Sequence, residues 1–186
     1  MDLRTAILNR RSIKEFTPRA VTRDEVDALL QLASTAPNHR LTNPLRFHVL
    51  GPVARRAYGE ILGARKAKKV EDPAAAQAMI DKVAAGEAAV PMVIGVSVAL
   101  HDNPEIREED YATAMMAVQN ILLGAVAMGL GSHLRSGAVM DDPRTRALLR
   151  LGEAERLVGL VQLGEPAAIP EAKPRKPPSE VTHWLA

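Results

Sequence analysis

The sequence predicts an α+β protein, in which a few buried strands are interspersed among helices. Apolar residues recur at helical spacing over most of the chain, whereas two continuous apolar runs, at 90–100 and 157–163, are rich in valine and leucine. Such runs are typical of central strands covered on both faces. The length of 186 residues suits one domain. We therefore expect a single domain over 1–186 with an extended, proline-rich tail at 166–186.

Capping residues and proline breaks delimit the expected elements. Thr22 and Glu25 form a capping-box pattern at the start of the second helix, and Pro37 ends that helix because the residue before proline resists helical geometry. The expected helices span 3–8, 22–36, 54–70, 73–86, 108–128 and 142–149, and the expected strands span 46–50, 90–100 and 157–163. Segments 10–12, 37–40 and 133–136 are expected to be loops. Val181, Trp184 and Leu185 at the end of the tail suggest that it docks on this subunit or on another.

Composition excludes several classes of function. The chain has no cysteine, so it has no disulfides, no cysteine-ligated metal and no cysteine nucleophile. The net charge of +2 and the short basic stretches argue against a nucleic-acid binder. Neither a secretory signal nor a run suited to a membrane is evident, so a cytoplasmic protein is expected. Only 3% of residues are aromatic, and an aromatic ligand would therefore be held by other groups.

Common catalytic and nucleotide-binding motifs do not fit either. Gly129 and Gly131 follow a helix rather than a strand, which excludes a dinucleotide-binding fingerprint, and a phosphate-binding P-loop is missing. The five histidines lack the spacing of a helical metal site, so no metal is expected. What remains is a set of basic and hydroxyl residues in the three expected loops.

These loops, in this order and spacing, resemble the motifs of the FMN-dependent nitroreductases. Arg10-Arg11-Ser12-Ile13-Lys14-Glu15-Phe16 resembles the opening motif, 36–44 with Arg46-Phe47 the second, and 129–138 the third. Residues 158–166 resemble the penultimate strand and turn, and 173–177 with 181–184 the usual tail. The resemblance covers nearly the whole chain, and the length is similar to that of the short subgroup of NAD(P)H nitroreductases.

The resemblance implies a mixed, mainly antiparallel sheet flanked by helices. It also implies an obligate homodimer, with the long helix from Glu108 at its centre, a C-terminal tail that reaches the partner and two FMN sites at the interface. FMN would carry hydride from NAD(P)H to nitroaromatic, quinone-like or other electrophilic small molecules. No catalytic side chain is expected, because the flavin carries the chemistry.

The resemblance also assigns residues to the cofactors. Arginine and serine suit phosphate and ribityl oxygens. The implied FMN contacts are Arg10, Arg11 and Ser12 at the phosphate and ribityl end, His133, Leu134 and Arg135 along the other side, Thr35 and His39 toward the partner's flavin, and Lys173 and Arg175 in the tail. The implied nicotinamide nucleotide contacts are Leu123, Gly124, Ala125, Val126, Ala127 and Met128. Leu45 and Leu134 stand where many members of the subgroup have tryptophan, which removes ring stacking worth roughly 0.5–1.5 kcal/mol for an aromatic pair.

Each residue taken singly also has a structural interpretation. Arg10 and Arg11 fit a solvated helix end, Thr35 fits a hydrogen bond back into its own helix, and His39 fits an ordinary surface histidine. Two alternative functions stay open: a flavoprotein of the same fold with a different reductive reaction, and a domain that binds phosphate or nucleic acid through its short basic stretches.

Overall fold

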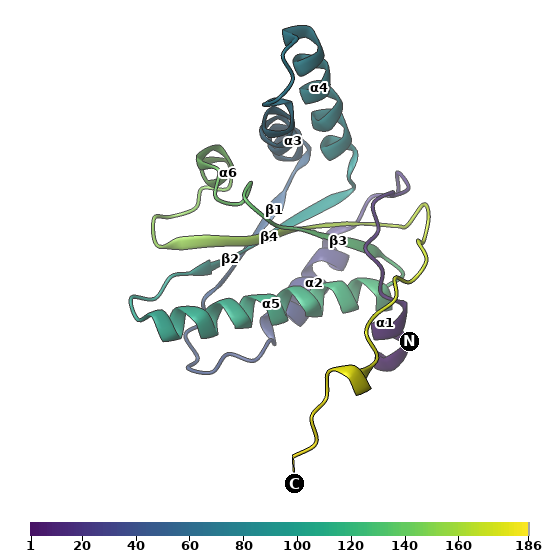
Figure 1. Cartoon of the computed structure of the whole chain (residues 1–186), viewed down its shortest axis with the longest axis vertical. Coiled ribbons are helices and arrows are strands. Elements are labelled where there is room, and N and C mark those ends of the chain that lie inside the picture. Colours follow the sequence, from purple (N-terminus) through teal and green to yellow (C-terminus); the bar gives the residue numbers. More distant parts are fainter. Residues whose placement is uncertain (186) are drawn as a thin grey trace.

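A computed structural model describes residues 1–185 and shows a four-stranded sheet between two groups of helices (Figure 1). The strands are β1 (Leu45–Leu50), β2 (Met92–Ala99), β3 (Gly131–Arg135) and β4 (Glu155–Gly164). Their order in the sheet is β1-β2-β4-β3, and every neighbouring pair is antiparallel. The predicted mainly antiparallel sheet is confirmed; its parallel component is one isolated bridge between Ser12 and Ser132.

Helices cover both faces of this sheet, with α2 and α5 on one face and α3, α4 and α6 on the other (Figure 1). The helices are α1 (Leu3–Asn9), α2 (Arg23–Ser34), α3 (Pro52–Ala67), α4 (Pro73–Ala89), α5 (Pro104–Ala127) and α6 (Pro143–Leu148), followed by the short 3₁₀ helix η1 (Pro178–Glu180). The capping box of α2 is present: the Thr22 hydroxyl accepts from the Glu25 N–H, and the Glu25 carboxylate accepts from the Thr22 N–H. Helices α3 to α6 each have proline in the first turn, where a missing N–H costs nothing.

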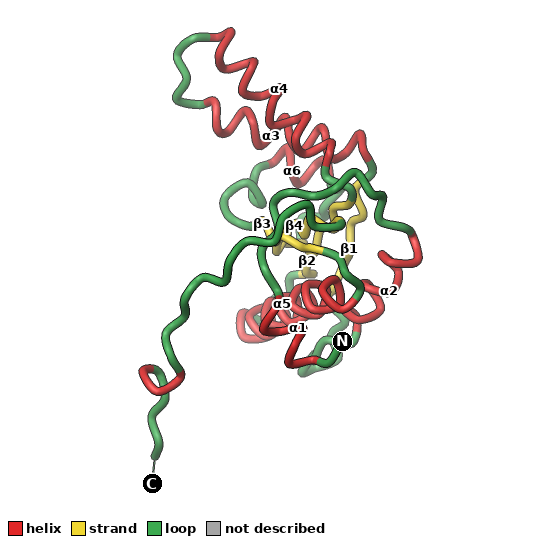
Figure 2. The backbone as a smooth tube through the Cα atoms, turned by 90° about the vertical axis from the view of Figure 1, so that its right-hand side faces the viewer, coloured by secondary structure: helices red, strands yellow, loops and turns green. Residues whose placement is uncertain are grey.

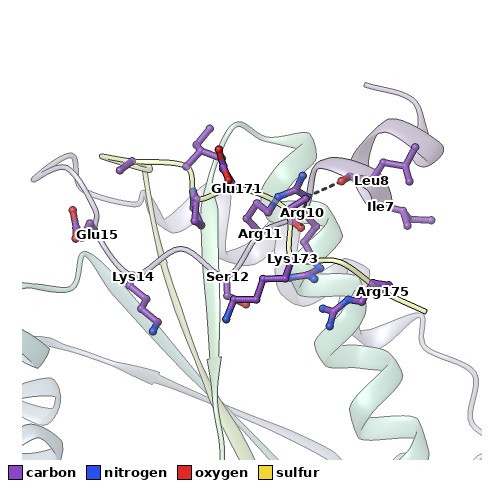
Figure 3. Close-up of a pocket in the computed structure, with 14 residues that line it drawn as sticks. Ile7, Leu8, Arg10, Arg11, Ser12, Lys14, Glu15, Glu171, Lys173 and Arg175 are labelled. Atoms are coloured by element: carbon purple, nitrogen blue, oxygen red, sulfur yellow. Dashed lines mark hydrogen bonds between the residues drawn. The ribbon is translucent and has the colours of Figure 1, made fainter. Parts of the chain in front are cut away.

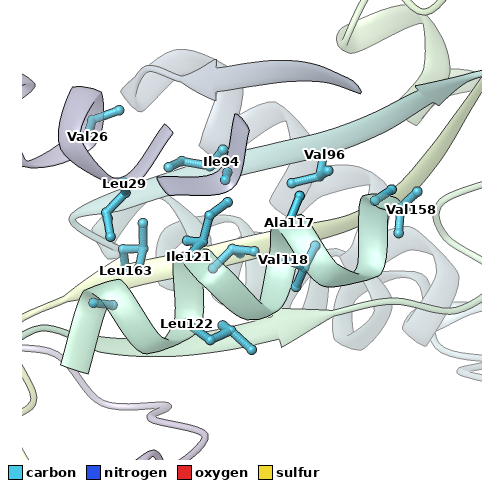
Figure 4. Packing of buried hydrophobic residues seen from close by; sticks show 14 of the residues in the cluster. Val26, Leu29, Ile94, Val96, Ala117, Val118, Ile121, Leu122, Val158 and Leu163 are labelled. Atoms are coloured by element: carbon cyan, nitrogen blue, oxygen red, sulfur yellow. The ribbon is translucent and has the colours of Figure 1, made fainter. Parts of the chain in front are cut away.

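The main core lies between α5, α2 and the central strands. Ala114, Ala117 and Ala125 of α5 are fully buried, and these small side chains let the helix approach the valines and leucines of β2 and β4 (Figure 4). Gly124 serves the packing of α5 against α2, since a Cβ there would lie 2.7 Å from Leu32 Cδ1. The prediction that 90–100 and 157–163 are central strands is thus confirmed, because β2 and β4 are the inner strands.

Two expectations about local structure were wrong. Residues 133–135 are not a loop but belong to edge strand β3, which is antiparallel to β4 with His133 opposite Gln162. The glycines that precede this short segment hide its strand character, and the long-range pairing decides its conformation. Helix α5 begins at Pro104 rather than at Glu108, because the Asn103 side chain caps it by accepting from the Glu105 N–H at 2.9 Å.

The tail leaves the body of the molecule after a few backbone contacts (Figure 2). Phe16 bridges to Pro166, and the Ala167 N–H donates to the Glu15 carbonyl at 3.0 Å. Trp184 and Leu185 are each 93% exposed, so the end of the tail does not dock on its own subunit, and docking on another subunit stays a prediction. Ala186 lies outside the described residues. No helix within residues 1–185 is long and apolar enough to cross a membrane.

Candidate functional site

A groove of about 770 Å³ lies where the N-terminal segment and the tail run side by side (Figure 3). Five of the predicted cofactor residues line it, namely Arg10, Arg11, Ser12, Lys173 and Arg175. The other lining residues are Ile7, Leu8, Lys14, Glu15, Ala168, Ile169, Pro170, Glu171 and Ala172. The fold thus brings together groups that are more than 160 positions apart in the sequence.

The electrostatics of the groove favour an anion. Five cationic side chains and two carboxylates line it, and none of the seven forms an ion pair within residues 1–185. An excess of three positive charges with no internal partner suits a ligand that carries a phosphate. Ser12 adds a small hydroxyl that can donate to a phosphate or polyol oxygen.

Local structure explains how the basic segment is held. Helix α1 ends when the Arg10 N–H donates to the Ala6 carbonyl, and the chain then runs extended along β3. Ile13 anchors this run: its side chain is buried, and its N–H donates to the Ser132 carbonyl at 2.9 Å. Because side chains alternate along an extended segment, burial of Ile13 leaves Ser12 and Lys14 available to the groove.

Arg11 is oriented by carbonyl groups of the chain itself. Its Nη1 donates to the Leu8 carbonyl at 2.7 Å and to the Arg10 carbonyl at 3.0 Å. These carbonyls lie at the end of α1, where a cation is favoured by the helix dipole. The structural interpretation of Arg11 as a helix-end cation is therefore compatible with a place in the groove, since a guanidinium has further N–H groups to offer.

The β3 residues are held by the sheet rather than by the groove lining. Leu134 packs against the main core, whereas the His133 and Arg135 side chains lie near Glu87 of α4. His133 Nδ1 lies 3.1 Å from Gln162 Oε1, and Arg135 Nη2 lies 2.9 Å from Glu87 Oε1. Burial lowers the pKa of His133, and the hydrogen bond to Gln162 partly offsets this effect.

Thr35 and His39 lie away from the groove. The Thr35 hydroxyl donates to the Leu32 carbonyl of its own helix at 2.7 Å. His39 Nδ1 lies 2.9 Å from Glu109 Oε1, near the start of α5, and this contact together with Arg40 lowers the pKa of Glu109. The groove is instead lined by Ile7 and Leu8 of α1, and α1 lies at the other end of α5 (Figure 1). Within one subunit, then, the structure does not bring these two residues to the groove.

The predicted nucleotide stretch forms the last turns of α5. Gly124 and Ala125 are buried, Leu123 and Val126 are half-buried, and only Ala127 and Met128 are exposed. None of the six lines the groove. Burial of Gly124 against Leu29 and Leu32 of α2 gives the stretch a packing role in this chain.

Several residues of the site were not predicted from the sequence. Lys14 lies two positions after Ser12 in an extended segment, so the period-two alternation of strands was the signal that could have identified it. Glu87 and Gln162 offer no local signal, because their contact joins positions 75 apart. Apart from Glu171, the tail residues 168–172 are short or apolar, and the stretch carries no motif of its own.

Curated relatives are similar to this chain over most of its length. "Putative NAD(P)H nitroreductase YfhC" of Bacillus subtilis is 30% identical over 176 residues, which cover 94% of this chain and 90% of the relative. "Putative NAD(P)H nitroreductase YdjA" of Escherichia coli K12 is 29% identical over 167 residues, which cover 89% of each.

Solved structures show the same fold. The crystal structure of the "Nitroreductase-like Family Protein" from Bacillus cereus matches with a TM-score of 0.86 and 26% identity, covering 100% of this chain and 96% of that one. The "FMN and NADPH-dependent nitroreductase NfnB" from sphigopyxis sp. strain HMH shares the fold at a TM-score of 0.80 with 18% identity, and all of each chain is covered. The model of the "Nitroreductase family" matches residues 7–165. With its antiparallel sheet, its flanking helices and its basic groove, the chain belongs to the nitroreductase family.

Proposed function

We propose that this chain is an FMN-dependent oxidoreductase, which passes hydride from NAD(P)H to nitroaromatic, quinone-like or other electrophilic small molecules. The observation that carries this proposal is the groove, in which Ser12 and five cations without an ion-pair partner in residues 1–185 surround a volume of about 770 Å³. The names of the relatives YfhC and YdjA support NAD(P)H as the electron donor. The name of NfnB supports FMN as the cofactor of this fold.

The residues of the groove fit FMN chemically. Its phosphate is doubly charged, and Arg10, Arg11, Lys173 and Arg175 supply more than the charge needed to neutralise it. Its ribityl chain carries hydroxyls, for which Ser12 is a partner of suitable size. FMN supplies the hydride chemistry when bound. The protein's part is to hold the phosphate end, with Arg11 fixed by the carbonyls of α1, and to leave the reacting face open.

The remaining predicted contacts require a second copy of the chain. Thr35 and His39 lie away from the groove of their own subunit, and the end of the tail carries Val181, Trp184 and Leu185 exposed. We propose a homodimer in which the tail packs on the partner subunit and the loop after α2 approaches the partner's FMN. The exposed apolar residues Leu3, Ile7 and Leu8 of α1 would lie in the same interface.

The test begins with the purified full chain. We expect a yellow protein whose released cofactor has the mass of FMN and which oxidises NADH or NADPH in the presence of nitro, quinone or enone acceptors. The panel of acceptors separates nitro reduction from another reductive reaction. Arg11→Ala should weaken FMN binding by about 10- to 100-fold, the loss expected for hydrogen bonds to a charged group. The matched control is Arg56→Ala on the exposed side of α3, which should leave binding unchanged. A colourless protein that binds no added FMN would overturn the proposal.

A further inference from the structure

A buried polar cluster lies between α4 and strands β3 and β4, next to the groove but outside its lining. It consists of Glu87, His133, Arg135 and Gln162, with the Tyr58 ring nearby. Glu87 is 4% exposed and Gln162 is 3% exposed. A buried carboxylate and a buried amide cost free energy unless they are hydrogen-bonded, so both groups need partners within the cluster.

The hydrogen bonds of this cluster permit only one orientation of each group. Arg135 Nη2 pairs with Glu87 Oε1 at 2.9 Å, and a carboxylate in such an ion pair can only accept hydrogen bonds. Gln162 must then turn its amide nitrogen to Glu87, and Nε2 lies 2.7 Å from Glu87 Oε2. The remaining amide oxygen of Gln162 can only accept, and the group 3.1 Å from it is His133 Nδ1.

This chain of donors and acceptors determines the tautomer of His133. Since Gln162 Oε1 accepts, His133 Nδ1 must carry the proton, and in the neutral ring Nε2 is left with a lone pair. Nε2 makes no hydrogen bond within residues 1–185. The neutral histidine side chain in water prefers the opposite tautomer, with the proton on Nε2. The two residues behind His133 thus impose a state that the ring would not choose by itself.

His133 lies in β3, beside the segment that contributes Ser12 and Lys14 to the groove lining. Ser12 of the groove lining bridges to Ser132, the neighbour of His133 in β3, and the charge of Lys14, another lining residue, acts on the ring. Lys14 and Arg135 disfavour the imidazolium, Glu87 favours it, and burial lowers the pKa most strongly. At neutral pH the ring therefore offers an acceptor rather than a charge.

We propose that Glu87 and Gln162 are positioning residues, which hold His133 in its Nδ1–H tautomer and so present Nε2 as a hydrogen-bond acceptor to an N–H or O–H group of the ligand in the groove. The identity of that ligand rests on the proposed function: FMN has a ring N–H and ribityl hydroxyls. The tautomer itself does not depend on FMN, because all the contacts that fix it lie within the chain.

Nitrogen NMR of the full chain with ¹⁵N-labelled imidazole rings tests this inference, with and without FMN. In the wild type we expect His133 with a protonated Nδ1 and a bare Nε2 in both samples. Gln162→Leu removes the acceptor and should shift His133 toward the Nε2–H tautomer. Glu87→Gln is nearly isosteric and should have the same effect, since the amide of Gln162 is then free to flip. This second variant keeps the test decisive should Gln162→Leu fail to fold.

Two controls separate positioning from general damage. Gln77→Leu changes an exposed glutamine of α4 and should leave His133 unchanged. His48, which is bound to Ser97 and lies in β1 at the opposite edge of the sheet, should keep its tautomer in every variant. FMN affinity should fall by about 5- to 10-fold in Gln162→Leu and in Glu87→Gln, the equivalent of one net hydrogen bond, and stay unchanged in Gln77→Leu.

The tautomer and the FMN affinity of each variant test different parts of the proposal. A protonated Nε2 in the wild type, or an unchanged tautomer in both variants, overturns the positioning role. A shifted tautomer without any loss of FMN affinity overturns the contact between Nε2 and the ligand. A wild-type chain that binds no FMN overturns the proposed function together with that contact, whereas the FMN-free spectra still decide whether Glu87 and Gln162 set the tautomer.

Discussion

Arg11 uses one of its guanidinium nitrogens for hydrogen bonds to the chain itself. Nη1 donates to the carbonyls of Leu8 and Arg10, which fixes the orientation of the planar guanidinium. A ligand that binds the remaining N–H groups therefore costs little further side-chain entropy. Lysine has a point charge and no fork, and it cannot satisfy both carbonyls and a phosphate in the same way. We expect Arg11→Lys to weaken FMN binding by about 3- to 10-fold, less than Arg11→Ala. Fluorescence titration with FMN measures this, and an Arg11→Lys variant that binds FMN as tightly as the wild type would show that only charge matters.

Tyr58 has a buried hydroxyl with no hydrogen-bond partner within residues 1–185. Burial, together with the charge of Glu87, raises the pKa of Tyr58 to about 12. An unsatisfied buried hydroxyl costs free energy, so Tyr58→Phe should leave the free energy of unfolding unchanged or raise it by up to about 2 kcal/mol. Tyr58→Ala, by contrast, should lower it by about 3–5 kcal/mol because a cavity remains. Urea denaturation distinguishes the two, and a clear loss in Tyr58→Phe would contradict the missing partner.

Single residues of the site could be predicted from the sequence where they belong to one short motif. Arg10, Arg11 and Ser12 stand together in one motif, and the structure places all three in the groove lining. The environment of His133 was not predictable, because its partner Gln162 and the carboxylate behind it come from distant segments. A buried hydrogen-bond network depends on which segments meet, and that information is absent from any short window of sequence.

At the scale of elements, capping and periodicity predicted most of the fold. The helix that starts after Thr22 and the break between α3 and α4 at Asp72 lie where side-chain caps and prolines require them. Strand β3 was missed because its five residues are stabilised by pairing with β4 rather than by their own propensity. Edge strands of this kind depend on tertiary contacts, which outweigh local preference.

The α3–α4 pair depends on glycine at its contact surface. A Cβ at Gly59 would lie 2.6 Å from Ala84 Cα, whereas one at Gly86 would meet nothing within 4 Å. We expect Gly59→Ala to lower the free energy of unfolding by about 1–3 kcal/mol through overpacking. Gly86→Ala, the matched control in the helix interior, should raise it by about 0.5–1 kcal/mol. Urea denaturation measures both changes. If Gly59→Ala behaves like Gly86→Ala, the two helices can separate at little cost.

Helix α6 depends on the ionised form of its cap. Asp142 accepts from the Arg144 backbone N–H at 3.0 Å and pairs with the guanidinium of Arg144, which lowers the pKa of Asp142 from 3.8 to about 2. Because the folded pKa lies below the unfolded one, this stabilisation is complete above pH 4 and is lost as the pH falls through 2. Asp142→Asn should cost about 1–2 kcal/mol at pH 7. Unfolding measured from pH 7 to pH 2 should show the variant and the wild type converging, and a constant difference would contradict the role of the charge.

At the scale of the whole molecule, α5 separates the two parts of the proposed site. His39 is bound to Glu109 near the start of this helix, whereas Ser12 is bridged to Ser132 just beyond its end. The 18 residue-to-residue steps from Glu109 to Ala127 span about 27 Å at the helical rise of 1.5 Å per residue. One subunit therefore cannot place His39 and Arg11 on the same FMN, and a complete site would combine the groove of one subunit with the loop of its partner.

A heterodimer of two defective chains tests this arrangement. In homodimers of Arg11→Ala, and in homodimers of His39→Ala, every site lacks one contact and should bind FMN more weakly than the wild type. In the mixed dimer, purified with a different tag on each chain, one site carries both substitutions and the other carries neither. Half of its sites should therefore bind FMN with wild-type affinity, as measured by titration with FMN. A mixed dimer of Arg11→Ala with Arg56→Ala, which should also keep one intact site, is the control. If no site of wild-type affinity reappears with His39→Ala, the site is not shared between subunits, and the loop after α2 has another function.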